Sequence, residues 1–234
     1  MSTWTMIVSH RGLSGDEPES TLDAFAATVA RGVEAIEFDV RRTGDGVLVV
    51  FHDAKADGLA IADVTYAELV ARIPGLCTLG EVLDVVPPAC LLDVEVKVPG
   101  FEEELVSALR AERGADSFVV TSFHDEVVAR VKALDPQVRA GLVLGNGRPR
   151  GGLRGRLSEH FPADRLRRSH SDLVVVEKVL LWSGLARRIS RPGYPVWVWT
   201  VNRPGLMRRM LRSPEVVAFV TDWPLEALAL RQEG

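Results

Sequence analysis

The sequence predicts a single (β/α)8 TIM barrel of the α/β class, and three observations favour that fold. Short apolar runs alternate with helical patterns, which indicates a parallel sheet whose two faces are covered by helices. The chain is 234 residues long and holds eight such strand-like units, which favours a closed barrel over an open sheet. No linker or low-complexity tract divides it, so we expect residues 1–234 to form one domain, with a short insertion after the second strand.

The order of the elements follows from apolar periodicity and from the breaker residues between them. The expected strands are Met6–Ser9, Ala35–Arg41, Val47–His52, Cys90–Lys97, Phe118–Ser122, Arg139–Leu144, Leu173–Val176, Pro195–Val201 and Ala218–Thr221. The expected helices are Ser20–Arg31, Phe101–Arg113, Asp125–Leu134, Val179–Ile189, Leu206–Leu211 and Leu225–Arg231. Ser20 is expected to cap the first helix. Val47–His52 follows the turn signal Thr43-Gly44-Asp45-Gly46, so we expect a hairpin with the preceding strand.

Composition limits the partners and the compartment. The net charge is −4 and the pI about 5.8, which gives no general affinity for nucleic acid or anionic membranes. Cys77 and Cys90 are expected to be buried or half-buried thiols in a reducing compartment rather than a disulfide framework. The first nine residues lack a signal-peptide pattern, and no apolar run approaches the roughly 18 residues that span a bilayer. We expect a cytoplasmic protein without stable membrane insertion or a nucleic-acid partner, and homo-oligomer formation stays open.

Two other features have ordinary structural interpretations. The segment Gly145–His170 contains seven arginines, at positions 148, 150, 154, 156, 165, 167 and 168. We interpret it as a solvated connection, with a phosphate-guiding rim as the alternative. The tryptophans Trp4, Trp182, Trp197 and Trp223 are expected in the barrel core or between the helices and the barrel.

Charged residues alternate with apolar ones in two of the expected strands. In the run 35–40, Glu37 and Asp39 share one face, and in the run 92–98, Asp93, Glu95 and Lys97 share one face. In a barrel the apolar faces pack against helices, so the charged faces point into the interior. Buried carboxylates repel one another unless they are paired or bound to a cation.

A hard metal ion is the natural counter-ion for such a cluster. Carboxylate oxygens with room for water suit Mg2+ or Ca2+ better than Zn2+, which prefers nitrogen and sulfur. The alternative is a buried salt-bridge network centred on Lys97, which can also coexist with a metal.

Two histidines end strand-like runs, His10 after residues 6–9 and His52 after residues 47–51. Active sites of these barrels form at the carboxyl ends of the strands, so both imidazoles are expected there. One can accept a proton from a nucleophile while the other donates one to a leaving oxygen. Arg11 and Lys97 offer positive charge to a phosphate. These groups together favour phosphoryl chemistry over redox or acyl transfer.

At these residues the sequence resembles the glycerophosphodiester phosphodiesterase family, over nearly the whole chain. The matching stretches are His10-Arg11-Gly12, Glu17-Pro18-Glu19-Ser20-Thr21, residues 32–40, residues 43–46, Val50-Phe51-His52-Asp53, residues 94–97, residues 198–202 and Thr221-Asp222-Trp223-Pro224. Their order and spacing are specific in combination, although each is weak alone.

The resemblance implies a (β/α)8 barrel and a role for each matching residue. By position, it implies His10 and His52 as the acid–base pair, Glu37, Asp39 and Glu95 as ligands of Mg2+ or Ca2+, Arg11 and Lys97 as phosphate contacts, Trp199 as a residue lining the substrate site, and Glu19 as a support for the metal or a histidine.

The implied reaction is hydrolysis of a small-molecule glycerophosphodiester to glycerol 3-phosphate and an alcohol, with the glycerol 2-hydroxyl attacking first. Ser20 replaces the family's usual asparagine, and the short segment between His52 and Leu79 leaves the alcohol specificity open. The alternatives are a related phospholipase D-like or phosphatidylinositol-cleaving barrel and a catalytically silent barrel that binds phosphodiesters. The head group, the metal used in the cell and the division of roles between the histidines stay open.

Overall fold

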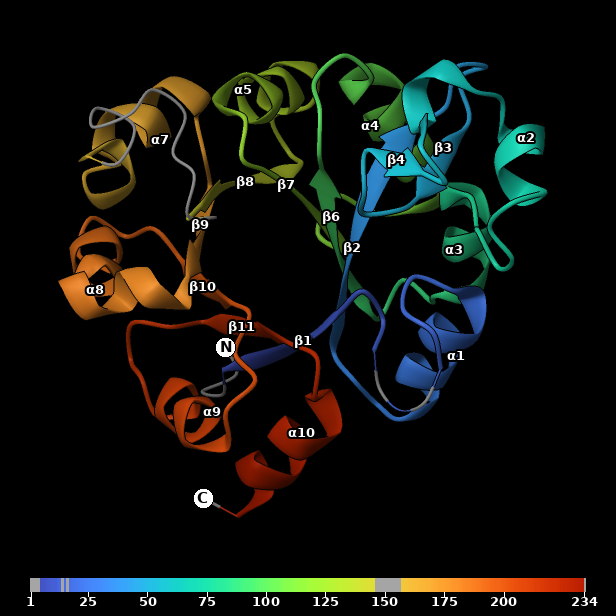
Figure 1. The fold of residues 1–234 in the computed structure, drawn as a ribbon. Helices are drawn as coiled ribbons and strands as arrows, with labels where there is room; N and C mark the ends of the chain where they lie inside the picture. Colours follow the sequence, from blue (N-terminus) through green and yellow to red (C-terminus); the bar gives the residue numbers. More distant parts are fainter. Residues whose placement is uncertain (1–4, 14, 16, 146–156, 234) are drawn as a thin grey trace.

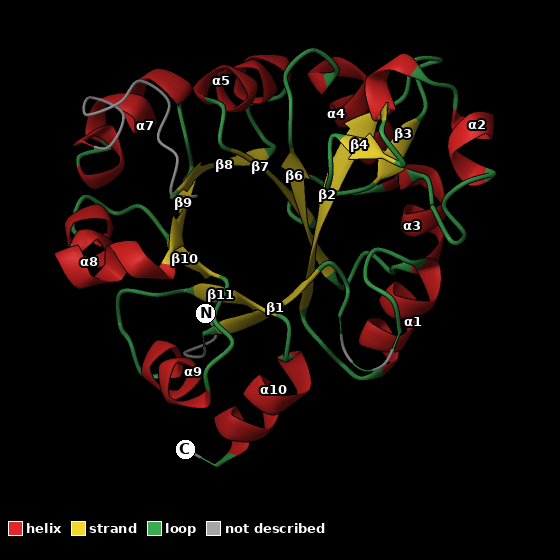
Figure 2. Ribbon diagram, in the orientation of Figure 1, coloured by secondary structure: helices red, strands yellow, loops and turns green. Residues whose placement is uncertain are grey.

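The computed structural model describes residues 5–13, 15, 17–145 and 157–233, and this part of the chain forms the expected barrel. Eight parallel strands surround the central axis and helices form an outer ring (Figures 1 and 2). The sheet closes because β1 pairs in parallel with both β2 and β11. Within the described residues no helix has the length and apolar character needed to cross a bilayer.

The elements follow the predicted order. The barrel strands are β1 (Met6–His10), β2 (Ala35–Arg42), β6 (Leu91–Val96), β7 (Phe118–Ser122), β8 (Arg139–Leu144), β9 (Leu173–Glu177), β10 (Val196–Trp199) and β11 (Ala218–Thr221). The helices around them are α1 (Leu22–Ala30), α3 (Leu79–Val85), α4 (Glu102–Glu112), α5 (Asp125–Leu134), α7 (Ala163–Ser169), α8 (Leu185–Ser190), α9 (Pro204–Leu211) and α10 (Pro224–Gln232).

Apolar side chains fill two layers on either side of the strands. The outer layer packs the helices on the barrel and includes Ile36, Phe38 and Val94. The inner layer lies within the barrel and includes Val8 and Trp197. This division confirms the face assignment made from the alternating pattern, since the charged residues of β2 and β6 point inward.

The register of β2 and β6 brings the charged residues side by side. Glu37 lies opposite Asp93, and Asp39 lies opposite Glu95. Adjacent strands are about 4.8 Å apart, so the carboxylates of two strands share one small volume.

The expected hairpin is present, and the insertion after it is small. β3 (Leu48–Val50) pairs antiparallel with β2, with Val40 opposite Val50. The insertion contains a two-stranded ribbon of β4 (Lys55–Ala56) and β5 (Leu59–Ala60), the 3-10 helix η1 (Ile61–Asp63) and α2 (Tyr66–Val70). Its own apolar cluster, which includes Ile61 and Leu69, holds it together.

Two helix predictions need correction. Thr21, not Ser20, caps α1, because its hydroxyl accepts a hydrogen bond from the Ala24 N–H at 3.3 Å. The expected helix Val179–Ile189 is divided into the 3-10 helix η2 (Lys178–Ser183) and α8, because Gly184 between them adopts a left-handed conformation with φ of 68°.

The arginine-rich segment is only in part a solvated connection. Four of its arginines, at positions 148, 150, 154 and 156, lie outside the described residues. Residues 163–169 form α7, and the largely buried guanidinium of Arg165 pairs with Asp125 and Glu159, both at 2.7 Å. Arg165 therefore ties the start of α5 to the segment before α7.

The predicted burial of the two cysteines is confirmed, and the tryptophan prediction is partly wrong. Cys77 and Cys90 are free and buried. Trp197 lies in the inner core, but Trp182 is 80% exposed and Trp223 is 58% exposed. Trp4 lies outside the described residues.

The conformation of Ser20 predicts a stabilising substitution. Ser20 has φ of 59°, a left-handed conformation that costs most non-glycine residues about 1–2 kcal/mol and is better tolerated by asparagine. We expect Ser20→Asn to increase the free energy of unfolding by about 0.5 kcal/mol in urea denaturation. Thr21→Ala, which removes the helix cap, should instead lower it by about 1 kcal/mol. A destabilised Ser20→Asn variant would contradict the backbone explanation.

Candidate active site

A cavity of about 150 Å3, lined by both charged and apolar side chains, opens at the carboxyl ends of the barrel strands. Its walls include eight of the residues selected from the sequence, namely His10, Arg11, Glu37, Asp39, His52, Glu95, Lys97 and Trp199. The barrel topology explains this convergence, since β1, β2, β6 and β10 all end on the same side. Glu19 is the one selected residue that does not line this cavity.

Three carboxylates form the charged centre of the site. Glu37, Asp39 and Glu95 each offer one oxygen, and these oxygens lie within 4.8 Å of one another. Burial, followed by repulsion from Asp39 and Glu95, raises the pKa of Glu37 well above its ordinary value. Burial also raises the pKa of Glu95, although Lys97 opposes the rise. Burial and mutual repulsion thus disfavour the ionised carboxylates, and a cation bound among them would offset both effects.

Lys97 supplies part of that positive charge. Its ammonium group contacts Asp39 Oδ1 at 2.7 Å and Glu95 Oε1 at 2.5 Å. Burial opposes the charged ammonium, but Glu95 and Asp39 outweigh it and raise the pKa of Lys97. Lys97 and Arg11 together supply two positive charges, one fewer than the three carboxylates carry when all are ionised.

The donor set fits a hard divalent cation. The three ligand candidates are all carboxylates, which Mg2+ and Ca2+ prefer. Asp39 Oδ2 is buried and has no hydrogen-bond partner among the described residues. A buried carboxylate oxygen without a partner is costly, and a cation at this position would satisfy it.

Arg11 lies beside the carboxylates in a constrained conformation. Its φ is 52°, its backbone N–H donates to Glu37 at 3.2 Å, and its Nε lies 3.5 Å from Asp39 Oδ2. Its Nη1 donates to Glu19 at 2.7 Å. Glu19 therefore contacts Arg11 rather than a histidine, so any support that it gives to the site passes through the guanidinium.

His10 is held by a carboxylate that the sequence analysis did not select. Its Nδ1 lies 2.5 Å from Asp222 Oδ1, and Asn202 donates its side-chain amide to the other oxygen of Asp222. Asn202 Oδ1 in turn accepts the Asp222 N–H at 3.0 Å. Although burial opposes it, the hydrogen bond and charge of His10 lower the pKa of Asp222. An ionised Asp222 fixes the ring so that Nε2 faces the cavity.

His52 has a similar but more exposed arrangement. Its Nδ1 lies 2.7 Å from Asp53 Oδ1, and its backbone carbonyl accepts two hydrogen bonds from Arg41, at 2.7 and 3.0 Å. Burial, with the nearby charge of Lys97, lowers the pKa of His52. The imidazole is thus favoured in its neutral form, which can accept a proton.

The remaining wall of the cavity is apolar. Trp199 and Phe123 form an edge-to-face pair with ring centroids 5.6 Å apart, and Trp199 Nε1 donates to the Leu144 carbonyl at 3.3 Å. Val143 and Val175 extend the same wall. A ligand with a charged end and a carbon-containing end would fit this division.

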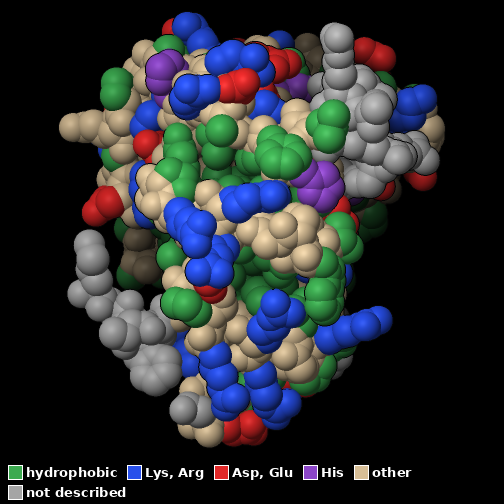
Figure 3. Space-filling model, turned by 90° about the vertical axis from the view of Figure 1, so that its left-hand side faces the viewer, with side chains coloured by type: hydrophobic (Ala, Val, Ile, Leu, Met, Phe, Trp, Pro, Cys, Tyr) green, Lys and Arg blue, Asp and Glu red, His purple; other side chains and the backbone are tan. Residues whose placement is uncertain are grey.

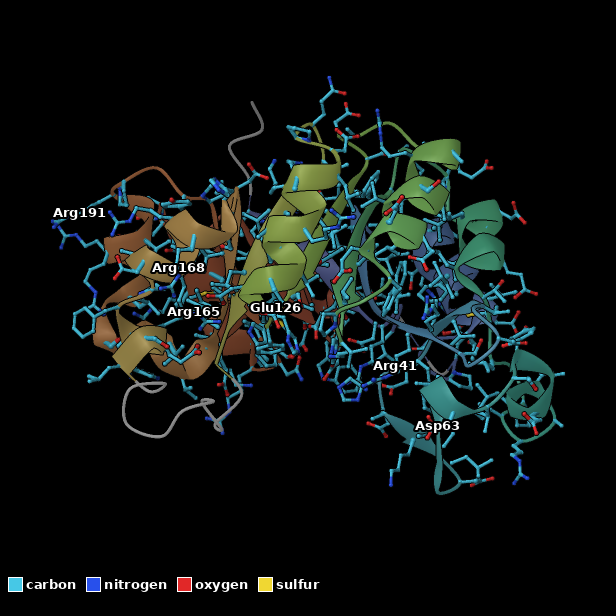
Figure 4. All side chains as sticks on the ribbon, turned by 90° about the horizontal axis from the view of Figure 1, so that it is seen from above. Arg41, Asp63, Glu126, Arg165, Arg168 and Arg191 are labelled. Atoms are coloured by element: carbon cyan, nitrogen blue, oxygen red, sulfur yellow. The ribbon has the colours of Figure 1, made fainter. Side chains whose placement is uncertain are left out.

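A second, larger cavity of about 540 Å3 adjoins the first and shares His52, Lys97 and Phe123 with it. Its other charged walls include Arg41 on one side and Glu126, Arg165 and Arg168 together on the other (Figure 4). Both cavities border His52, so a ligand can extend from one into the other past this histidine.

Asp222 gives a second prediction, on catalysis. Because Asp222 orients His10, Asp222→Asn should lower kcat roughly 10²-fold or more with little change in KM. Asp53→Asn is the matched comparison, since Asp53 contacts His52 but its side chain is 72% exposed, and it should cost less than tenfold. Steady-state kinetics of both variants measure this difference, and equal effects would contradict a special role for Asp222.

The sequence analysis selected the charged residues at the centre of the site but missed the residues that hold or flank them. Asp222 directly follows the strand Ala218–Thr221, a position that could have marked it as a residue of the barrel mouth. Phe123 follows β7 in the same way. The contact between Asn202 and Asp222 joins two loops and could not be read from spacing.

Comparisons with known proteins agree with this fold. Residues 10–226 match the model of the Glycerophosphoryl diester phosphodiesterase family. A Glycerophosphodiester phosphodiesterase from Caldanaerobacter subterraneus subsp. tengcongensis is 27% identical over 255 residues, covering 98% of this chain and 99% of that protein.

Solved structures share the fold. A glycerophosphodiester phosphodiesterase from Thermotoga maritima superposes with a TM-score of 0.78 at 24% identity, over 97% of this chain and 98% of that one. A phosphodiesterase from Oleispira antarctica, solved with the product sn-glycerol-3-phosphate, gives a TM-score of 0.80 at 22% identity, over 98% and 97% of the two chains. The family match covers nearly the whole chain, and the chain belongs to the glycerophosphoryl diester phosphodiesterase family.

Proposed function

We propose that this protein hydrolyses glycerophosphodiesters to glycerol 3-phosphate and an alcohol, with a divalent metal and the histidine pair His10 and His52. The observation that carries the proposal is the convergence of two oriented imidazoles, two cations and three carboxylates on one cavity at the barrel mouth. The family to which the chain belongs and the product bound to the Oleispira antarctica relative support this choice of substrate.

Glu37, Asp39 and Glu95 are the proposed ligands of Mg2+ or Ca2+. The bound ion would neutralise charge on the phosphoryl group and help to orient it. Arg11 and Lys97 add positive charge beside the same position, and the guanidinium can donate two hydrogen bonds to phosphate oxygens. These groups would place the phosphate between the two histidines.

Proton transfer is assigned to the histidines. In the first step, one imidazole accepts the proton of the glycerol 2-hydroxyl as its oxygen bonds to phosphorus, and the other protonates the departing alcohol oxygen. In the second step, water attacks the cyclic phosphate and the proton transfers are reversed, which releases glycerol 3-phosphate. An internal nucleophile gains from its high effective concentration. Asp222 and Asp53 hold the rings in position for these transfers.

The two cavities suggest where the two halves of the substrate lie. The smaller cavity, with Trp199 and Phe123 along its apolar wall, suits the glycerol phosphate. The larger cavity beyond His52 has charged and polar walls, which suits a water-soluble leaving alcohol rather than an acyl chain.

The proposal is tested by product formation. The purified protein, supplied with Mg2+ or Ca2+, is incubated separately with glycerophosphocholine, glycerophosphoethanolamine and glycerophosphoglycerol, and glycerol 3-phosphate is measured with a coupled dehydrogenase. We expect release from at least one substrate. Failure with all three, while metal binding is demonstrated by calorimetry, would contradict the substrate assignment.

A further inference from the structure

One side of the barrel is formed by a segment of the chain that contains basic residues but no acidic ones. Residues 178–212, which form η2, α8, β10 and α9, contain eight Lys or Arg and no Asp or Glu, although the whole chain has a net charge of −4. Figure 3 faces the side of the molecule with α7 and α8, where Lys and Arg side chains gather around exposed hydrophobic groups. We call the surface formed by residues 178–212 the basic face.

Most of this charge is available to an external partner. All seven arginines of the basic face are exposed, at positions 187, 188, 191, 203, 208, 209 and 212. Arg208 pairs with Glu233 at 3.3 Å, and Arg188 donates to the His160 carbonyl. The other five have no carboxylate partner among the residues that the structure describes. Arg191 projects from the outer edge of the molecule (Figure 4).

Exposed apolar side chains accompany the arginines. Trp182 is 80% exposed and Val179 is 53% exposed, and both belong to η2. The guanidinium of Arg209 lies over the Trp182 ring, 5.4 Å from its centroid. Leaving an indole in water is unfavourable, and a tryptophan beside cations is typical of side chains at a lipid–water interface.

A hollow of about 360 Å3 lies between η2 and α9. Its apolar lining comes from Val179, Leu181, Trp182 and Leu206, and its cationic lining from Lys178, Arg203 and Arg209. A lining that combines apolar and cationic side chains complements a lipid phosphate and the carbon chain next to it. This amphipathic lining distinguishes the surface from one that binds nucleic acid through charge alone.

We propose that the basic face docks on the surface of an anionic phospholipid bilayer, with the arginines against the lipid phosphates and Trp182 inserted among the head groups. Docking is peripheral, since residues 178–212 form short helices around β10. The arginines and Trp182 that make the proposed contacts do not line the cavity at the barrel mouth, and the proposal stands independently of the proposed reaction.

The test is co-sedimentation of the full-length protein with vesicles of equal parts phosphatidylglycerol and phosphatidylcholine, compared with pure phosphatidylcholine vesicles. We expect binding to the anionic vesicles that weakens as salt is added. Arg191→Glu and Arg209→Glu should each weaken binding at least about fivefold, the effect of losing one cation near the surface. Trp182→Ala should weaken binding as well, because the inserted ring is lost.

Arg72→Glu is the matched control, since Arg72 is exposed on the segment between α2 and α3, outside the basic face. It should bind the anionic vesicles like the unaltered protein. All four variants should retain activity on glycerophosphodiesters if the proposed reaction holds, and circular dichroism verifies their folding in any case. Absence of vesicle binding, equal effects of Arg72→Glu and Arg191→Glu, or binding to a single-stranded oligonucleotide in place of vesicles would overturn the proposal.

Discussion

Replacing His10 or His52, the proposed acid–base pair, should nearly abolish turnover. We expect His10→Ala and His52→Ala each to lower kcat about 10³-fold, because general acid or base catalysis by one group contributes roughly 10²–10⁴-fold. The loss should appear in kcat more than in KM, since Arg11 and Lys97, the proposed phosphate contacts, and the proposed metal ligands are unchanged. Steady-state measurement of glycerol 3-phosphate release gives both parameters.

His170→Asn is the control for these variants. His170 is exposed, ends α7 with φ of 55° and does not line the cavity. Asparagine tolerates this left-handed conformation, so the variant should fold and turn over normally. A loss of less than tenfold in both His10→Ala and His52→Ala would contradict acid–base roles for the pair.

The second large effect concerns the metal. Asp39→Asn should weaken binding of Mg2+ and Ca2+ about 100-fold or more, because it removes one of three carboxylates, whose buried Oδ2 has no hydrogen-bond partner among the described residues. Isothermal titration calorimetry measures the affinity directly. Thermal unfolding gives an independent readout, since a ligand that binds only the folded state raises the melting temperature.

Asp63→Asn is the matched control for charge. Asp63 is exposed in η1, in the insertion and away from the cavity (Figure 4). It removes the same charge from the chain as Asp39→Asn but should leave metal affinity and the metal-dependent rise in melting temperature unaltered. Unchanged affinity in Asp39→Asn would contradict the proposed ligand set.

The fold was predictable because its main signals are periodic. Runs such as Phe118–Ser122 and Arg139–Leu144 match the observed strands at both ends, since a barrel strand is apolar on both faces. The wrong predictions concern helix ends, where the backbone conformation of a single residue determines whether a helix continues. Gly184 divides the predicted helix Val179–Ile189. The backbone of Ser20 is left-handed, and the N-cap of α1 is Thr21 instead.

The part of the site that could be predicted consists of residues within the barrel strands. Glu37, Asp39 and Glu95 could be predicted because they are charged residues that alternate with apolar ones in two strands. The parallel pairing of β2 with β6 then brings their side chains together inside the barrel. The partners that orient the histidines depend on contacts across the barrel. The His10–Asp222 contact joins residues 212 positions apart, and only the pairing of β1 with β11 brings them together.

The central claim is a reaction that needs a bound metal and two acid–base histidines. Its most direct test is a metal titration of protein from which metal has been removed. The EDTA-treated protein and its His10→Ala and His52→Ala variants are titrated with Mg2+ and Ca2+, and glycerol 3-phosphate release and metal binding are recorded together. We predict that metal restores activity to the unaltered protein, while both variants bind metal with similar affinity and stay inactive. Full activity without metal, or restored activity in either variant, would contradict the proposed chemistry.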